Sequence, residues 1–172
     1  MTKDWFILSR QKIKFLLGYY IILFIIGLIL TLFALLQESI QMPFTMTISL
    51  ISVIGGFGTA LIGSSTFYLR KIYKASINKE MSSPTNEDER VRELGIFAYY
   101  FLRPLFAIGF SILIHIALKS SVHLITVKET RLDEGFIYLT LFLSFFAGFA
   151  AGDLITYIEE KSAEWVTKTF KH

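Results

Sequence analysis

The sequence predicts an all-α, polytopic membrane protein with four transmembrane helices in a bundle and both termini in the cytoplasm. Three observations lead to this fold class. The chain of 172 residues is 53% hydrophobic and has a mean hydropathy of +0.57, outside the usual balance of a soluble globular domain. Four long apolar stretches recur along it, and lysine and arginine gather between alternate stretches. This length leaves room for a single membrane domain, residues 1–172.

Each apolar stretch has the length of one membrane crossing. The stretches cover residues 15–36, 45–69, 95–118 and 136–158. About 20 helical residues, rising about 1.5 Å each, cross a hydrocarbon core of about 30 Å. The runs lack the alternation of membrane β-strands, and a spanning helix satisfies its own backbone hydrogen bonds. The first stretch is also too long for a cleavable signal peptide, so we expect it to stay as an anchor.

The distribution of positive charge predicts the orientation. Most lysines and arginines lie before the first span, between spans two and three, or after span four, whereas few lie in the other two connections. The positive-inside rule therefore places both termini and the loop of about residues 70–94 in the cytoplasm. Seven of the eight tyrosines fall near this same interface. They are Tyr19, Tyr20, Tyr68, Tyr73, Tyr99, Tyr100 and Tyr157.

The segments outside the spans carry their own local signals. Met42-Pro43 predicts a turn and a restart before the second span. Asn86, with Glu89 three residues later, predicts that the third helix begins outside the bilayer. Residues 159–172 predict an amphipathic helical tail along the interface, and we expect Trp5 to Leu8 to lie there in the same way.

Small residues form stripes on the second and fourth spans, at the spacing of a helix face. Such stripes allow two helices to approach closely, which predicts tight packing within the chain or between copies. A second interpretation is that the small hydroxyl-bearing residues line a polar path. The candidate packing or pore-lining residues are Gly56, Ala60, Gly63, Ser64, Ser65, Thr66, Gly148 and Gly152.

Arg103 and Asp153 are charged residues inside the third and fourth spans, at similar predicted depths from the cytoplasmic side. An unpaired intramembrane charge costs about 2.5–3.5 kcal/mol, so we expect the two to form an intramembrane salt bridge. Pro104 frees a carbonyl near Tyr100, which Ser64, Ser65 or Thr66 could satisfy. One interpretation gives the pair a role in helix register, or lets Arg103 reach the headgroups. Another makes it a gate or an ion site.

Enzyme signatures are missing from the sequence, so we expect no catalytic site, no cofactor and no metal site. Phosphate-binding loops, nucleophile elbows and zinc-protease motifs do not occur, and cysteine is absent. His115 is a single imidazole with no second ligand at metal spacing. The net charge of +3 comes from residues that flank apolar spans, which argues for a membrane partner and against nucleic acid.

Three motifs resemble a pattern in small uncharacterised bacterial four-helix membrane proteins. They are the glycine-rich second span ending at Arg70, the Phe101-Leu102-Arg103-Pro104 step, and Phe145-Phe146-Ala147-Gly148-Phe149 before Asp153. The resemblance implies a packed helical core and no particular activity. Such sequences often carry glycine soon after the Arg-Pro step, where this chain has Phe106 and Ala107. With four spans, the bacterial inner (cell) membrane is the expected location.

Two functions fit these observations. The first is an accessory or scaffold subunit of a membrane assembly. Its small-residue faces would bind another membrane protein or a further copy of itself, and its charged cytoplasmic loop and tail would receive a soluble partner. The alternative is a homo-oligomeric ion channel or permeation subunit, with a cytoplasmic-side gate near Arg103 and Asp153. No span shows a sustained polar stripe, whereas a pore-lining helix usually has one, so the sequence favours the accessory function.

Overall fold

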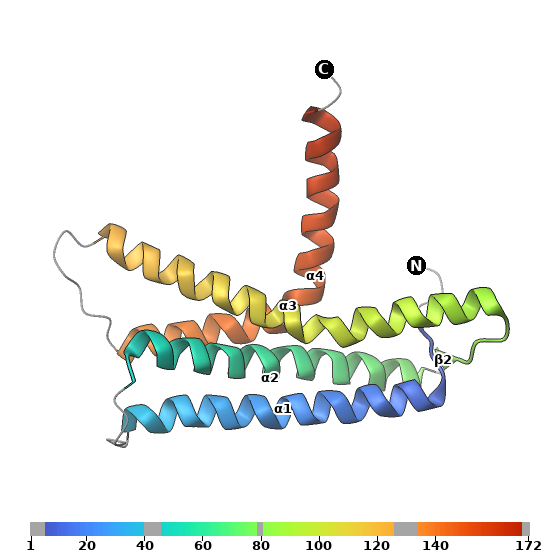
Figure 1. Ribbon diagram of the computed structural model, residues 1–172, viewed down its shortest axis with the longest axis horizontal. Coiled ribbons are helices and arrows are strands. Elements are labelled where there is room, and N and C mark those ends of the chain that lie inside the picture. Colours follow the sequence, from blue (N-terminus) through green and yellow to red (C-terminus); the bar gives the residue numbers. More distant parts are fainter. Residues whose placement is uncertain (1–5, 40–45, 79–80, 126–133, 170–172) are drawn as a thin grey trace.

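The chain folds into four long helices (Figure 1), in a computed structural model that describes residues 6–39, 46–78, 81–125 and 134–169. The helices are α1 (Arg10–Ser39), α2 (Ile48–Ile77), α3 (Glu87–Ile125) and α4 (Glu134–Thr169). Each contains a stretch long and apolar enough to cross a membrane, which confirms the prediction of four such helices. The helices also extend beyond the predicted spans, so much of the polar segment 70–94 is helical.

The second helix, α2, is the innermost of the four. It packs against α1, α3 and α4, and 61% of its most apolar window is buried. The corresponding windows of α1 and α3 are only 17% and 28% buried. This difference follows from composition, because the small glycine, alanine and serine residues of α2 let three neighbouring helices approach its backbone.

A two-residue strand pair joins the beginning of the chain to the segment before α3. β1 (Phe6–Ile7) runs parallel to β2 (Met81–Ser82), and the Leu8 amide donates to the Ser82 carbonyl at 3.0 Å. The expectation of an interfacial helix from Trp5 to Leu8 is therefore wrong over its described part. Ile7 and Leu8 are buried, because their apolar side chains pack against the bundle.

The start of α3 follows the sequence signal. The Glu89 amide donates to Asn86 Oδ1 at 2.9 Å, which confirms the predicted helix start before the apolar stretch. Glu89 Oε2 in turn accepts from the Thr85 amide at 2.6 Å. The predicted turn at Met42-Pro43 lies outside the described residues, as do residues 126–133 of the other external connection.

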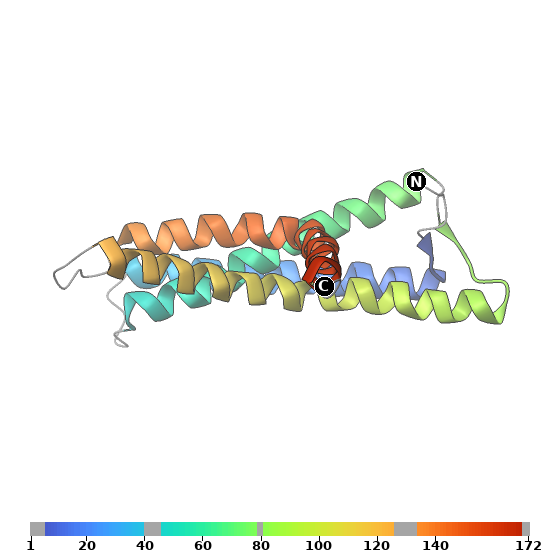
Figure 2. The same ribbon diagram turned by 90° about the horizontal axis from the view of Figure 1, so that it is seen from above.

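The fourth helix changes direction partway along its length. It first runs beside α2 and then turns away, so that its C-terminal part projects from the bundle (Figures 1 and 2). Burial marks the same point, because Ala151 and Gly152 are buried whereas Asp153 and Leu154 are exposed. The expected helical tail is present as far as Thr169, although the side chains that would make it amphipathic lie largely outside the described ones.

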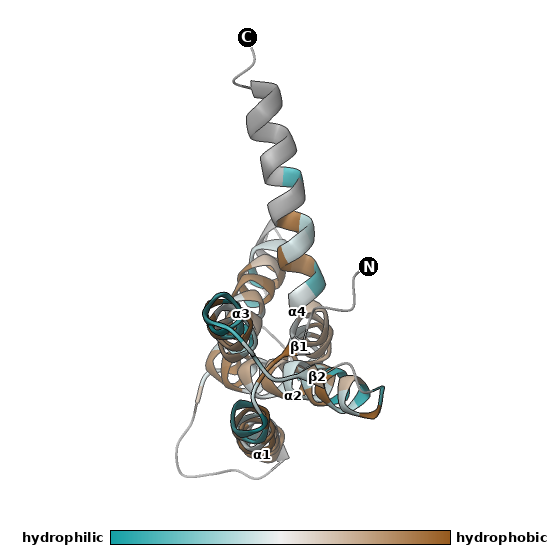
Figure 3. Cartoon of the chain, turned by 90° about the vertical axis from the view of Figure 1, so that its right-hand side faces the viewer, coloured by the Kyte–Doolittle hydropathy of each residue, from teal (hydrophilic) through white to brown (hydrophobic). Residues whose placement is uncertain are grey.

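The core consists of three clusters along the bundle. Aliphatic residues of α1, α2 and α4 form the cluster near the 40–45 connection, three alanines form the middle one, and the largest cluster, at the other end, contains three tyrosines. The end of the bundle that holds this largest cluster also carries the hydrophilic starts of α1 and α3, which Figure 3 shows end-on. The buried members of this tyrosine cluster are Leu8, Leu16, Tyr20, Tyr68, Ile72, Ala75 and Tyr100.

Candidate functional site at the turn of α4

Arg103 lies where α4 leaves the bundle. Its side chain is 3% exposed, and Nη1 donates to the main-chain carbonyls of Gly152 at 3.1 Å and Ala151 at 3.4 Å. Its guanidinium carbon also lies 3.8 Å from the centre of the Tyr99 ring. Carbonyl dipoles and an aromatic face both stabilise a cation that has lost its water. Arg103 therefore ties α3 to α4 at the turn.

The proline that follows Arg103 explains a second buried polar contact. Pro104 lacks an amide hydrogen, so the carbonyl of Tyr100, one turn earlier, loses its helical donor. The Tyr20 hydroxyl of α1 donates to that carbonyl. The sequence analysis expected a hydroxyl of α2 in this position, but α1 supplies it because the long tyrosine side chain spans the gap between helices. A neighbouring tyrosine, Tyr19, donates to the Phe101 carbonyl at 3.1 Å.

Asp153 is exposed, although it follows directly after the two residues that Arg103 contacts. The main-chain carbonyls, rather than the Asp153 carboxylate, accept the hydrogen bonds of the guanidinium. The direct salt bridge between Arg103 and Asp153 thus stays a prediction.

Hydroxyl groups converge on the same level of the bundle. A Cβ placed on Gly152 would lie 2.5 Å from Tyr68 Oη and 3.7 Å from Arg103 Nη1, so both groups approach this glycine. Ala60 lies against Gly148, and the same register brings Ser64 opposite Gly152 four residues later. Within the described part of the chain, the hydroxyls of Ser64, Ser65 and Tyr68 are buried without a hydrogen-bond partner.

The small residues of α2 and α4 lie in contact with neighbouring backbone. A Cβ on Gly148 would collide with the Ala60 carbonyl, and one on Gly63 would collide with the Phe145 carbonyl. These positions thus bring α2 and α4 to backbone contact. Thr66, the last of the predicted hydroxyl residues, is exposed and faces away from this contact.

Two further polar contacts lie deeper in the bundle. The Ser111 hydroxyl donates to Ser144 Oγ at 2.9 Å, and a Cβ on Gly56 would lie 2.8 Å from Ser111 Oγ. Nearer the far end, His115 Nε2 lies 3.1 Å from Ser49 Oγ. Among the described residues, no group of three histidines or carboxylates is placed to hold a metal ion.

A groove on α3 lies beside this site and was not predicted from the sequence. Arg92, Gly95, Ile96, Tyr99 and Tyr100 line it, and they belong to three successive turns of the helix. Spacings of three and four residues put such side chains on one helix face. That spacing is visible in the sequence, but the sequence does not show that α4 leaves this face uncovered.

Neither protein-family models nor curated proteins nor solved structures match this chain. The site must therefore be understood from its own geometry. It combines a fixed buried cation, several buried hydroxyls and the turn of a helix, which together suit it to hold the turn or to bind a small polar group.

Proposed function

We propose that the chain is inserted in a membrane as a four-span protein, with both termini and the segment between α2 and α3 in the cytoplasm. The burial of α1 and α3 supports this, because large apolar side chains remain exposed along both. Ile22, Ile29, Leu105 and Leu113 are between 58% and 60% exposed. A bilayer covers such surfaces, whereas a soluble monomer rarely exposes apolar patches of this extent.

Single cysteines test the orientation, since the natural chain has none. We expect a membrane-impermeant maleimide added to intact cells to label Ser121→Cys and to spare Ser76→Cys. Both positions are exposed at opposite ends of the bundle. Labelling of Ser76→Cys alone would reverse the orientation, and labelling of neither, or of both alike, would argue against a crossing between them.

Within the membrane, we propose a non-enzymatic accessory or scaffold role. The supporting observation is that the small-residue faces of α2 lie inside the chain, where they contact α1, α3 and α4, whereas large apolar side chains remain exposed on α1 and α3. The small-residue faces expected to bind a partner are therefore occupied within the chain. A partner membrane protein would pack on the outer face of α1 or α3, through side-chain packing between helices.

Photo-crosslinking in the native membrane tests this role. A photoreactive residue replaces Ile29 on α1 or Leu113 on α3, and both positions are 60% exposed. We expect one of the two faces to give a discrete adduct with another protein, while the second serves as the matched lipid-facing control. Lipid adducts alone from both positions would contradict the accessory role.

The buried hydroxyls beside Arg103 support the second candidate, a homo-oligomeric channel or permeation subunit with its gate near Arg103 and Asp153. Because α2 is enclosed, a route between copies would run along α1, α3 or α4. Ion flux into liposomes containing the natural chain or Asp153→Asn tests this alternative. Flux that depends on Asp153 would favour the channel, and the absence of flux from folded protein would favour the accessory role.

A further inference from the structure

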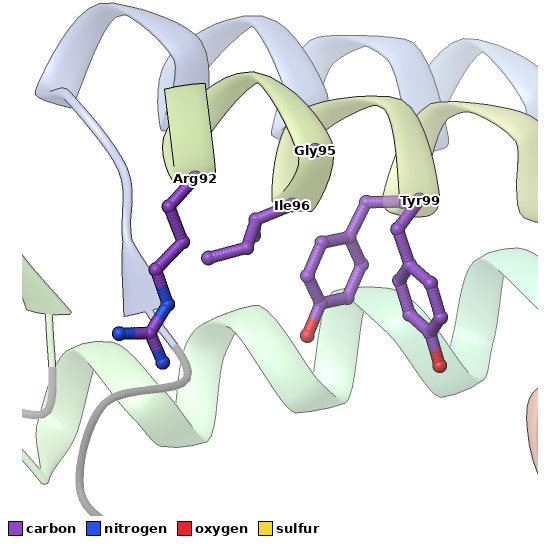
Figure 4. A pocket seen from close by; sticks show the side chains of 5 residues that line it. Arg92, Gly95, Ile96 and Tyr99 are labelled. Atoms are coloured by element: carbon purple, nitrogen blue, oxygen red, sulfur yellow. The ribbon is translucent and has the colours of Figure 1, made fainter. Parts of the chain in front are cut away.

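The groove on α3 lies along the part of the bundle that α4 does not cover. It has a volume of about 400 Å³, and its lining comes from Arg92, Gly95, Ile96, Tyr99 and Tyr100. Figure 4 shows Arg92, Ile96 and Tyr99 extending from α3 toward α2. The volume falls in the range of ligand pockets, about 300–1,000 Å³.

The turn of α4 leaves this groove open. In the other half of the bundle, α4 packs on α2 and α3 as far as Gly152, beside Arg103. The groove begins on α3 just beyond that level, since Tyr99 and Tyr100 are its lining residues nearest to Arg103. Over the described residues, the part of α4 that would have covered this face projects away from it instead.

The walls of the groove are apolar, and its ends carry positive charge. Arg92 is exposed at one end. At the other end, the Arg103 guanidinium stacks on Tyr99, and Lys71 Nζ lies 6.0 Å from the centre of the Tyr100 ring. A cavity with apolar walls and cationic ends fits an amphiphile with an anionic headgroup.

Among the described carboxylates near the groove, none forms an ion pair with Arg92. Glu93 faces the opposite side of α3, where it accepts from the Ser9 amide and pairs with Lys12 at 2.8 Å. Glu89, one turn before Arg92, accepts hydrogen bonds from Thr85 and also interacts electrostatically with Arg92, although the two do not form an ion pair. Asp153 interacts electrostatically with Lys71, at the end of the groove farther from Arg92.

The depth of the groove relative to a bilayer follows from α1, and this step rests on the proposed membrane insertion. The apolar run of α1 begins at Phe15, whose ring lies 5.8 Å from that of Phe97. The hydrocarbon layer would thus begin near Phe97. Arg92 comes five residues earlier, about 7.5 Å outward, which places it at the outer part of a headgroup layer about 5–7.5 Å thick. Tyr99 lies about 3 Å inside the hydrocarbon.

We propose that the groove binds an anionic phospholipid of the cytoplasmic leaflet, with its phosphate on Arg92 and an acyl chain along Ile96 and Tyr99. Basic pockets between helices on the cytoplasmic side bind acidic lipid headgroups in the same manner. The groove extends from Arg92 to Tyr100 on α3, a rise of about 12 Å, which is short for a partner helix but sufficient for the upper part of a lipid.

Binding of phosphatidylglycerol to the purified, delipidated protein tests this proposal, with phosphatidylcholine as the neutral comparison. The readout is the concentration of each lipid that raises the unfolding temperature in detergent. We expect stabilisation by phosphatidylglycerol at much lower concentration than by phosphatidylcholine. Arg92→Ala should weaken the effect of phosphatidylglycerol about fivefold, since one basic residue near the surface contributes about 1 kcal/mol. Arg90→Ala, an exposed arginine outside the groove, is the matched control and should retain the effect.

Filling the groove gives a second test that leaves the charge in place. A Cβ on Gly95 meets no atom within 4 Å, and the same holds for Gly109 further along α3. We expect Gly95→Leu to abolish the preference for phosphatidylglycerol and Gly109→Leu to retain it. If Arg92→Ala and Gly95→Leu both bind the lipid as the natural chain does, the proposal is wrong.

Glycerol 3-phosphate separates a lipid from a free phosphate. Stabilisation by this soluble headgroup equal to that by the lipid would contradict the role given to the acyl chain. The cysteine labelling described above reports membrane insertion independently of lipid binding. A failure of the lipid site in a correctly inserted protein is therefore distinguishable from a failure of insertion.

Discussion

The same two helices, α2 and α3, are covered by α4 in one half of the molecule and left open in the other. The covered half comprises residues 48–64 of α2 and 134–152 of α4, and the open half comprises residues 65–77 of α2 and 87–102 of α3. In the covered half, glycine, alanine and serine bring α2 and α4 to backbone contact, and an aliphatic cluster with Ile51, Ile137 and Leu141 packs near the 40–45 connection. In the open half, tyrosines fill the interior, and lysine and arginine border the groove.

The two halves differ in how many helices pack against α2, and this number determines which side chains fit between them. Where α1, α3 and α4 all approach α2, only small residues leave room for three backbones. At the level where α4 turns away, long side chains fill the interior instead. The rings of Tyr20 and Tyr68 lie 5.5 Å apart, and Tyr68 Oη reaches Gly152, the last buried glycine of α4. Arg103 stands at the boundary and hydrogen-bonds the last carbonyls of the covered half.

The largest expected loss of stability comes from a steric collision in the covered half. Gly148→Leu should destabilise the protein by about 3 kcal/mol, because the new side chain meets the Ala60 carbonyl, which cannot move without its helix. Thermal unfolding in detergent measures the loss. Gly109→Leu, where a Cβ meets nothing within 4 Å, is the control and should unfold near the natural temperature. Equal losses of stability from both variants would contradict this prediction, because Gly148 would then be no more closely packed than Gly109.

A smaller effect is expected at the boundary. Arg103→Leu should cost about 2 kcal/mol, because the carbonyls of Ala151 and Gly152 lose a charged donor. Asp153→Leu should cost much less, since Asp153 is exposed. The double variant then decides the predicted salt bridge. Additive losses would support the carbonyl contacts, whereas recovery of stability in the double variant would establish the direct pair.

The ion pair of the open half should contribute less than Arg103. Lys12→Met should cost about 1 kcal/mol, because Glu93 is 7% exposed in its side chain and loses its cation, while Lys12 itself is partly in solvent. Lys14→Met, an exposed lysine on the same helix, should leave the denaturation midpoint unchanged. A loss of stability from Lys14→Met as large as that from Lys12→Met would mean that the overall positive charge of α1, and not the ion pair between Lys12 and Glu93, stabilises the protein.

The smallest expected effect is that of one hydroxyl pair in the covered half. Ser111→Ala should cost about 0.6 kcal/mol, the average for hydrogen bonds between helices in a membrane, because Ser144 loses its donor. Ser121→Ala, whose hydroxyl bonds only its own helix at an exposed position, should change the unfolding temperature less. The reverse order would show that this contact does not stabilise the covered half.

The sequence was sufficient to predict the four helices and the start of α3, because long apolar runs and a local capping signal do not depend on tertiary contacts. It also predicted that Arg103 and Asp153 lie at the same level of two helices, and Arg103 in fact contacts the carbonyl of Gly152, the residue before Asp153. The partner of the Tyr100 carbonyl was missed, since Tyr20 is distant in sequence and its reach depends on how α1 packs. The strand pair at Ile7 and the open groove were missed for the same reason.

The turn of α4 creates the open half, because α4 stops covering α2 and α3 at this point. The chain has no cysteine, so spin labels can be attached at chosen pairs of positions in the protein reconstituted in liposomes. The register of Ala60 against Gly148, continued along a straight α4, would place residue 166 beside residue 78 at a helix separation of about 8–10 Å. Instead, the C-terminal part of α4 projects away from the bundle (Figures 1 and 2).

The measurement is the pulsed-EPR distance between labels at Asn78→Cys and Val166→Cys. Labels at Thr66→Cys and Leu154→Cys, next to the turn, serve as the control pair that should stay close together. We predict a distance for the first pair well beyond that of the control pair. A distance as short as that of the control pair would contradict the account, because α4 would then cover α2 and α3 along their whole length and close the groove.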